Sequence, residues 1–456
     1  MRYFSLTRIT GLFLFMVVTQ GAWAQRGDIQ YFRYYDQRGV NVFETSKRDT
    51  IIYDGFKLRI GANFTQGFQS LKHSNTSGIP LYDLATGFPL AQANLNIDVQ
   101  LADGVRISLV SYMSTHHHNE TWVKGGYLQI DKVSFLKSAV LDKIWENLTL
   151  KVGHMEINYG DAHFRRSDGG NTFWNPFMEN NIMDAFTTEI GAELYWHRNG
   201  IIAMAGMTNG EIQGSVTRSS DRSPSVYGKI GFDKPIGEKS RVRITGSLLN
   251  KTSSISGTLY GGDRTGSNYQ YVMEPSSATL TGNAFAGRMN PNFKDNVTTV
   301  MLNPFIKLGG IEVFGTFEMA KGQNAVENGE VQYAASAADA TVFTKLKDRK
   351  FKQIAVDVLY RFGTRDQYYA GAKYNIVKGN QVFGQSTTTT TFGGISQGTR
   401  ADVSVERLAA GAGWFITRNI LVKGEYVTQK YKDFPAANIL EGGKFSGFVL
   451  QGSIAF

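Results

Sequence analysis

The sequence predicts an all-β protein, a sixteen-stranded antiparallel transmembrane β-barrel with long extracellular loops at one rim and short periplasmic turns at the other. Three observations lead to this prediction. Apolar and polar residues alternate over repeated segments, the connections between segments alternate between long and short, and the chain ends on an amphipathic segment with a terminal aromatic residue. Strands of transmembrane barrels show such alternation because one face meets lipid and the other meets the lumen.

Residues 1–24 are predicted to be a signal peptide. Arg2 and Arg8 form a basic start, an apolar run over 9–18 follows, and residues 22–24 (Ala-Trp-Ala) provide a cleavage site of small residues. The apolar run is too short for a membrane-spanning helix, which needs about 20 apolar residues. Residues 25–55 show no regular pattern, so we expect a periplasmic lead-in segment, with packing in or under the barrel mouth as one arrangement. The barrel itself is predicted over 56–456.

The barrel strands are predicted from a period of two in hydrophobicity. Residues 57–64 alternate between polar and apolar side chains, and residues 94–101 repeat the pattern. Extending this reading along the chain predicts strands at 56–66, 91–101, 105–115, 121–131, 147–157, 187–197, 200–208, 224–233, 240–250, 297–307, 310–320, 350–362, 367–377, 402–416, 419–430 and 444–456. An even number of strands places both ends of the barrel at the same rim.

The connections between these strands are sorted by length. Short ones fall at 103–104, 198–199, 308–310, 363–366 and 417–418, and long ones at 67–90, 158–186, 209–223, 251–296, 321–349, 378–401 and 431–443. Barrels in outer membranes have long extracellular loops and short periplasmic turns. The short connection 114–120 and the long connection 132–146 depart from this alternation.

The last strand carries a predicted assembly signal. Phe448, Leu450, Ile454 and the terminal Phe456 lie on one face of an extended segment. Such a segment resembles the signal that the outer-membrane assembly machinery recognises, so this machinery and outer-membrane lipid are predicted partners. An edge strand of a soluble β-sandwich is the alternative.

The composition agrees with a large closed sheet. There are 50 Gly, 21 Tyr and 30 Phe residues, with 9 Pro and no Cys. Aromatic residues form girdles at the two membrane interfaces of such barrels. No window of the chain after residue 24 approaches 18 consecutive apolar residues, which excludes an α-helical membrane protein.

No catalytic constellation is recognisable. The His116-His117-His118 cluster lies in a predicted loop, and adjacent histidines on an extended chain point in opposite directions, which makes a poor metal site. No serine occurs in a G-x-S-x-G context. We therefore predict no catalytic residue, no metal site and no cofactor, and nothing in the sequence indicates a nucleic-acid partner.

The segment 148–160 resembles the phosphate-selective porin O and P family, whose members carry a strand of the type L-x-L-x-x-G-x-x-x-x-x-[FY]-G before their longest functional loop. Segments 126–131 and 408–426 are also similar to this family. The resemblance implies a sixteen-stranded barrel in a Gram-negative outer membrane, a homotrimer, and a third outer loop folded into the lumen. The family's phosphate site uses a dense ladder of Arg and Lys that this chain does not match residue by residue.

The third outer loop, 158–186, contains the predicted pore constriction at Arg165 and Arg166. If the loop folds inward, these cations would raise the local anion concentration at the narrowest point. The alternative is that they are solvated charges of the loop or pair with Glu179 or Asp184 within the protein. Strand parity predicts a set of basic residues on the pore lining, where they outnumber acidic ones: Lys57, Arg59, Arg106, Lys151, Lys229, Arg241, Arg243, Lys373 and Lys423.

Taken together, these features predict passive diffusion of small hydrophilic solutes, with a mild preference for anions and phosphate selectivity as a narrower form. Two alternatives remain open. An oligosaccharide-specific channel would use Tyr127, Tyr195, Tyr227 and Tyr369 as a stacking track. A non-conducting structural or adhesin barrel would have a lumen filled by loops.

Overall fold

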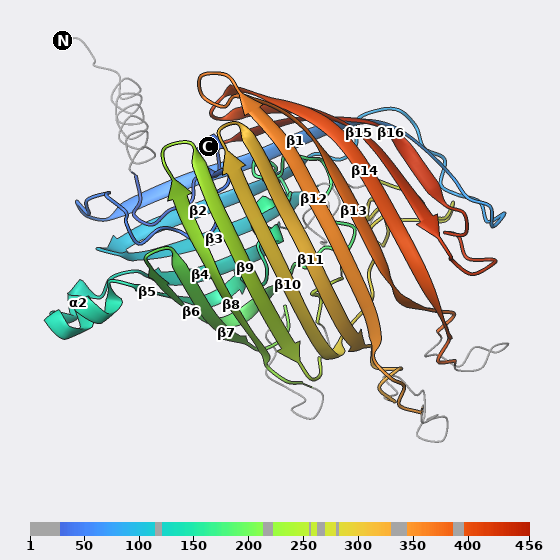
Figure 1. The fold of residues 1–456 in the computed structure, drawn as a ribbon, viewed down its shortest axis with the longest axis horizontal. Coiled ribbons are helices and arrows are strands. Elements are labelled where there is room, and N and C mark those ends of the chain that lie inside the picture. Colours follow the sequence, from blue (N-terminus) through green and yellow to red (C-terminus); the bar gives the residue numbers. More distant parts are fainter. Residues whose placement is uncertain are drawn as a thin grey trace, which may run out of the picture.

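The chain forms a closed antiparallel β-barrel of sixteen strands, which confirms the predicted fold class (Figure 1). The computed structural model describes residues 28–456 apart from 115–120, 213–221, 255–256, 262–269, 280–281, 330–343 and 386–395. The barrel closes where β1 (Lys57–Ser74) pairs with β16 (Lys444–Ala455). The predicted signal peptide and the histidine cluster lie outside the described residues.

Each strand pairs with its neighbours in sequence. The remaining strands are β2 (Gln92–Ala102), β3 (Val105–Ser114), β4 (Thr121–Ile130), β5 (Leu148–Glu156), β6 (Thr188–Arg198), β7 (Ile201–Thr208), β8 (Ser225–Ile236), β9 (Ser240–Lys251), β10 (Asp295–Leu308), β11 (Ile311–Gln323), β12 (Arg349–Phe362), β13 (Tyr368–Phe383), β14 (Thr399–Thr417) and β15 (Ile420–Lys432).

The alternation of the sequence becomes an inner and an outer face. Along β12, Phe351 and Gln353 are buried inside the barrel, whereas Ile354, Val358 and Tyr360 are exposed on the outside. An apolar outer face and a polar inner face suit a barrel surrounded by lipid. Every strand with a described burial pattern repeats this arrangement with local interruptions.

Several strands extend beyond their predicted ends. The strand predicted at 56–66 continues to Ser74, and the strand predicted at 367–377 continues to Phe383. Residues 66–74 no longer alternate, so periodicity gave no sign of the extension. Both extensions lie at the rim with the long loops, where the outer face of a strand no longer needs to be apolar.

The connections separate into two rims. The inner rim carries the turns 103–104, 199–200, 237–239, 309–310, 363–367 and 418–419, whereas the outer rim carries 75–91, 157–187, 209–224, 252–294, 324–348, 384–398 and 433–443. The long inner connection between β4 and β5 contains η3 (Ser134–Leu136) and α2 (Ala139–Trp145). Among the described residues, no helix is long and apolar enough to cross a membrane.

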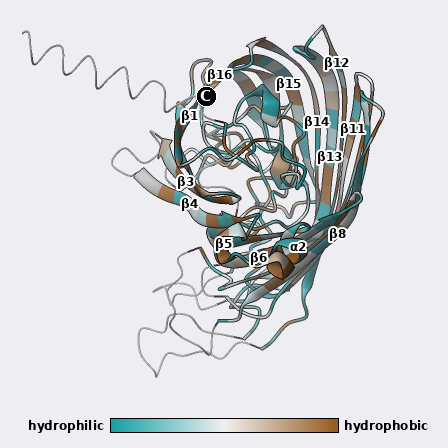
Figure 2. Cartoon of the chain, turned by 90° about the vertical axis from the view of Figure 1, so that its left-hand side faces the viewer, coloured by the Kyte–Doolittle hydropathy of each residue, from teal (hydrophilic) through white to brown (hydrophobic). Residues whose placement is uncertain are grey.

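Three segments lie inside the barrel and fill much of it (Figure 2). The first is residues 28–55, here called the inner girdle, which includes η1 (Gln37–Gly39). The second is the connection 157–187, here called the inserted loop, which includes η4 (Ala162–Arg165). The third is the described part of the connection 252–294. These segments decide which part of the inner wall remains accessible.

Candidate solute pathway through the lumen

The inner girdle follows the inside of the inner rim. The Gln30 backbone N–H donates to Gln100 of β2 (2.9 Å), and the Gln37 N–H donates to the Arg418 carbonyl in the last turn (3.0 Å). Further along, Asn41 donates to Glu312 of β11 (2.7 Å). Lys47 then donates to the Leu148 carbonyl at the start of β5 (2.6 Å). The girdle therefore contacts strands on opposite sides of the barrel.

A buried ionic cluster attaches both the inner girdle and the inserted loop to the wall. Glu44 of the girdle lies 2.7 Å from Arg243 of β9 and 3.2 Å from Lys229 of β8. Asp161 of the inserted loop lies 2.8 Å from each of the same two cations. Burial alone would raise the pKa of Glu44, but the two cations outweigh it and hold this pKa well below its usual range. Burial and the same two cations also act in opposite directions on Asp161, and the cations lower its pKa to about 2.

The girdle and the inserted loop also pack directly on each other. Arg33 donates to the Phe164 carbonyl (2.8 Å), and its guanidinium stacks 3.5 Å from the ring centre of Trp174. Tyr35 also stacks on Trp174, with 6.0 Å between the ring centroids. Burial lowers the pKa of Arg33 to about 9. Cation–π and stacking contacts of this kind become stronger when water is excluded.

The inserted loop packs against the inner faces of four neighbouring strands, β12–β15. Lys423 of β15 donates to the carbonyls of Thr172, Asn175 and Phe177 at 3.0, 2.9 and 2.8 Å. Other wall side chains bind the loop backbone in the same way: Glu425 accepts from Met178 N–H, Asn375 from Ile182 N–H, Gln353 from Met183 N–H, and Arg407 donates to the Asn180 carbonyl. A buried loop needs such partners because its main-chain groups are out of reach of water. We call the inner faces of β12–β15 the covered wall.

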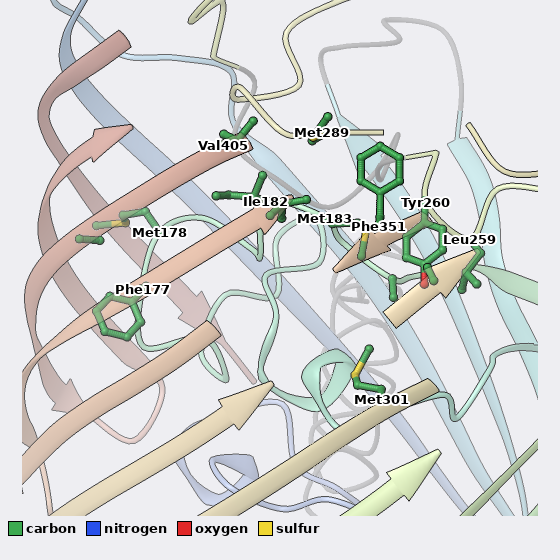
Figure 3. Close-up of a cluster of buried hydrophobic side chains, with 14 of the residues drawn as sticks. Phe177, Met178, Ile182, Met183, Leu259, Tyr260, Met289, Met301, Phe351 and Val405 are labelled. Carbon is green, nitrogen blue, oxygen red and sulfur yellow. The ribbon is translucent and has the colours of Figure 1, made fainter. Parts of the chain in front are cut away.

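An apolar cluster packs between the inserted loop and the covered wall (Figure 3). Phe177, Met178, Ile182 and Met183 of the inserted loop are 2 % exposed or less. They belong to one cluster with Phe351 and Val405 of the wall and with Leu259, Tyr260 and Met289 of the connection 252–294. Burial of large apolar side chains stabilises each by about 1.5–3 kcal/mol.

The opposite side of the lumen contains a cavity. It has an empty volume of about 1260 Å³, including its opening to solvent, and lies between the inserted loop, the girdle and the inner faces of β2–β6. We call these inner faces the open wall. Its lining includes Asn96, Arg106, Tyr127, Lys151 and His197 from the wall, and Phe32, Tyr35, Trp174 and Phe186 from the girdle and loop.

Arg165 and Arg166 diverge from each other inside the protein. Arg165 donates to Asn41 and lies 3.8 Å from Glu312, and burial lowers its pKa. Arg166 forms an ion pair with Asp184 at 2.7 Å. Their side chains are 2 % and 4 % exposed. Arg166 therefore pairs with Asp184, as in the alternative stated above, whereas the partner of Arg165 is Glu312, which that alternative did not name.

The nine basic wall positions fall into two groups. Most have partners: Lys57 pairs with Asp54, Arg241 with Asp233, Lys373 with Asp357, Lys229 and Arg243 with Glu44 and Asp161, and Lys423 holds loop carbonyls. Arg59 lies over the Phe32 ring at 4.8 Å. Arg106 and Lys151 are the two that line the cavity of the open wall without an ion pair in the described part of the chain.

The aromatic positions considered for a stacking track do not form a row. Tyr127 and Tyr195 line the cavity, but Tyr227 donates to Glu193, and Tyr369 packs near Phe415. The inner girdle, with Glu44 as its ionic contact, was not recognised as a functional element in the sequence. Residues 28–55 lack periodicity because they adopt no strand, so no pattern in the sequence signalled where they lie.

Comparisons with known proteins relate this architecture to porins. An anion-selective porin from Comamonas acidovorans matches with a TM-score of 0.52 and 10% identity, covering 88% of this chain and 100% of that chain. The outer-membrane channel DcaP of Acinetobacter baumannii matches with a TM-score of 0.48 and 10% identity, covering 89% and 99%. OmpT, an outer membrane protein of Vibrio cholerae, matches with a TM-score of 0.48 and 11% identity, covering 89% and 99%. Identities this low support the barrel fold alone.

No family model matches the chain, and no curated protein matches it. The resemblance to phosphate-selective porins is therefore supported only at the level of a porin-like barrel. Substrate preference has to be argued from the lumen itself.

Proposed function

We propose that this protein is a channel of a Gram-negative outer membrane through which small hydrophilic solutes diffuse passively, with a preference for anions. The observation that carries the proposal is the cavity beside the open wall, which lies between the barrel strands and the segments inserted into the lumen. Polar side chains from five neighbouring strands line it. The proposed transport needs no cofactor and no chemical step.

The preference for anions rests on Arg106 and Lys151. Both line the cavity, and in the described part of the chain neither lies within ion-pair distance of a carboxylate. Among the carboxylates of the same lining, Glu156 pairs with His163 and Asp168 with Arg166, whereas Asp98 interacts with Arg106 over a longer distance. A low-dielectric wall focuses the field of such cations and raises the local anion concentration. We assign selectivity to these residues rather than to Arg165 and Arg166, whose charges are compensated inside the protein.

Export and assembly complete the proposal. Residues 1–24 act as the signal peptide, and the terminal Phe456, which is 51 % exposed beside the last strand, serves the outer-membrane assembly machinery. The exposed apolar faces contact outer-membrane lipid. The functional unit is a homotrimer, as in porins of the family that the chain resembles.

Single-channel recording in planar bilayers tests the proposal. We expect steady open events from the purified, folded barrel and a reversal potential shifted toward the chloride equilibrium in a potassium chloride gradient. Phosphate added to one side tests the narrower preference for that ion. A reversal potential on the potassium side would contradict anion preference, and a folded barrel that never conducts would contradict the channel.

A non-conducting structural barrel is the second candidate. The packing of the inserted loop against the covered wall favours it, because the buried Lys423 and the apolar cluster leave little space for solutes beside these strands. Liposome swelling separates the two candidates. A channel admits small sugars into vesicles at a rate that rises with protein content, whereas a structural barrel leaves the vesicles impermeable.

A further inference from the structure

The open wall carries a row of inward side chains across four strands. Arg106 of β3 stands opposite Gln129 of β4, Gln129 opposite Lys151 of β5, and Lys151 opposite Glu193 of β6. Neighbouring strands lie about 4.8 Å apart, so the backbones of Arg106 and Lys151 are separated by about 10 Å. Their long side chains can therefore approach one small ligand from two sides.

The carboxylate nearest to Lys151 in this row is occupied elsewhere. Glu193 accepts hydrogen bonds from the Asn158 N–H (2.7 Å), the Tyr227 hydroxyl (2.8 Å) and the Tyr195 hydroxyl. Arg106 donates to Gln129 at 2.6 Å and also interacts with the Tyr127 hydroxyl and with the carboxylate of Asp98, which lines the same cavity. The Arg106 Nε is buried without a hydrogen-bond partner among the described residues. Buried donors in proteins nearly always have a partner. In this row the Arg106 Nε is therefore the donor whose hydrogen bond is not made within the described residues.

Aromatic rings stand between and around the two cations. The Tyr127 ring centre lies 5.8 Å from the Arg106 guanidinium carbon and 5.4 Å from Lys151 Nζ, and the Tyr195 ring lies 5.1 Å from Lys151. Gly153 faces Tyr127 across the strands, where a Cβ would come within 2.8 Å of the Tyr127 Cα. Its φ of +142° is rarely adopted by other residues. This glycine lets Tyr127 lie close to the wall beside both cations.

We propose that Arg106, Lys151 and Tyr127 form a binding subsite for small organic monocarboxylates that carry an apolar or aromatic body. The cations bind the carboxylate, and the body packs on Tyr127 and on the aromatic side of the cavity formed by Tyr35 and Trp174. Charge-assisted hydrogen bonds are the strong ones in such a site. The inference rests on the proposed channel for its physiological meaning, but the subsite exists independently of conduction.

Calorimetric titration of the detergent-folded barrel tests the subsite directly. Benzoate is the probe, with acetate, inorganic phosphate and benzyl alcohol as comparators. We expect benzoate to bind at least about tenfold more tightly than each of the others. Equal or tighter binding of phosphate would overturn the ligand class. Equal binding of benzyl alcohol would overturn the role of the cations, and equal binding of acetate that of the aromatic rings.

Variants locate the site. Lys151→Met should weaken benzoate binding about tenfold, and Lys151→Arg should retain it within about threefold, because the charge and a donor remain. Tyr127→Leu should weaken benzoate but not acetate. The matched control is Lys352→Met on the outer face of β12, which removes one positive charge away from the lumen. An equal loss in that control would overturn the assignment.

Conductance separates the failure of this inference from the failure of the channel. Benzoate should block chloride current in the wild type, and Lys151→Met should relieve the block. Benzoate binding by calorimetry without any current would support the proposed subsite and contradict the proposed channel. Current without benzoate binding would support the proposed channel and contradict the proposed subsite.

Discussion

The covered wall and the open wall have the same alternating sequence pattern and opposite roles. Lys423 on the covered wall holds three carbonyls of the inserted loop, whereas Lys151 on the open wall lies between two tyrosine rings beside a cavity. Both are inward lysines on barrel strands. The difference shows that parity decides which side of the barrel a residue faces, and the inserted segments decide what that residue can bind.

The two walls also differ in how their polar groups are satisfied. Main-chain groups of the inserted loop pair with Gln353, Asn375 and Glu425. On the open wall, Arg106 donates to Gln129, and the Arg106 Nε has no hydrogen-bond partner among the described residues.

The largest effect is expected from Lys423→Met, which should loosen the inserted loop from the covered wall and expose these strands to the lumen. Removing the ammonium leaves three loop carbonyls without their donor, at a cost of about 1–3 kcal/mol for each buried group. We expect lower resistance to guanidinium unfolding and a larger single-channel conductance.

The matched control for this prediction is Lys430→Met, on the outward face of the same strand, which should change neither quantity. An unchanged conductance in Lys423→Met, with the variant folded, would show that the loop is held by its apolar cluster instead.

A smaller effect is expected from Glu44→Gln at the inner girdle. The substitution weakens the ion pairs to Arg243 and Lys229, at a cost of about 3 kcal/mol for a buried pair. Because the chain lacks cysteine, a single Thr45→Cys reports release of the girdle through faster thiol labelling. Labelling in the Glu44→Gln background should be faster than in the Thr45→Cys parent at pH 7.

The pH dependence of this labelling follows from the depressed pKa values. A carboxyl whose folded pKa lies below its unfolded pKa stabilises the folded state above the unfolded pKa, and this stabilisation is lost as pH falls through the folded pKa. For Glu44 and Asp161 the parent should label slowly from pH 8 down to about 5, and faster only below the ordinary carboxyl range near 4. Faster labelling already between pH 7 and 5 would point to another titrating group.

The smallest effect on selectivity is expected from Arg165→Ala and Arg166→Ala. Each arginine is neutralised within the protein, by Glu312 and by Asp184, so the reversal potential should change less than in Lys151→Met. Reversal potentials in a salt gradient compare the three variants. A larger shift in the Arg165 or Arg166 variant would support a selective constriction at the inserted loop. It would contradict the assignment of selectivity to the open wall.

The barrel was predictable from the sequence, and its interior was not. Alternation at 57–64 and 94–101 placed residues on the correct faces because lipid outside and polar groups inside impose a period of two. The contacts of Glu44 with Lys229 and Arg243 join residues far apart in the sequence, and neither the girdle nor the inserted loop has a repeating pattern. Arg166 illustrates the limit, since its type favoured a pore charge and its neighbour Asp184 compensates that charge.

The path of the inner girdle has a consequence for the order of assembly. The girdle precedes every strand in the chain, yet its Gln37 bonds to the turn that joins β14 and β15. That contact spans most of the chain and can form only after the final hairpins have been added. Contacts between distant segments form late, because the loop between them has to close first. The Gln37 contact therefore has to wait for β14 and β15, whereas Gln30 at the start of the girdle needs only β2 for its bond to Gln100.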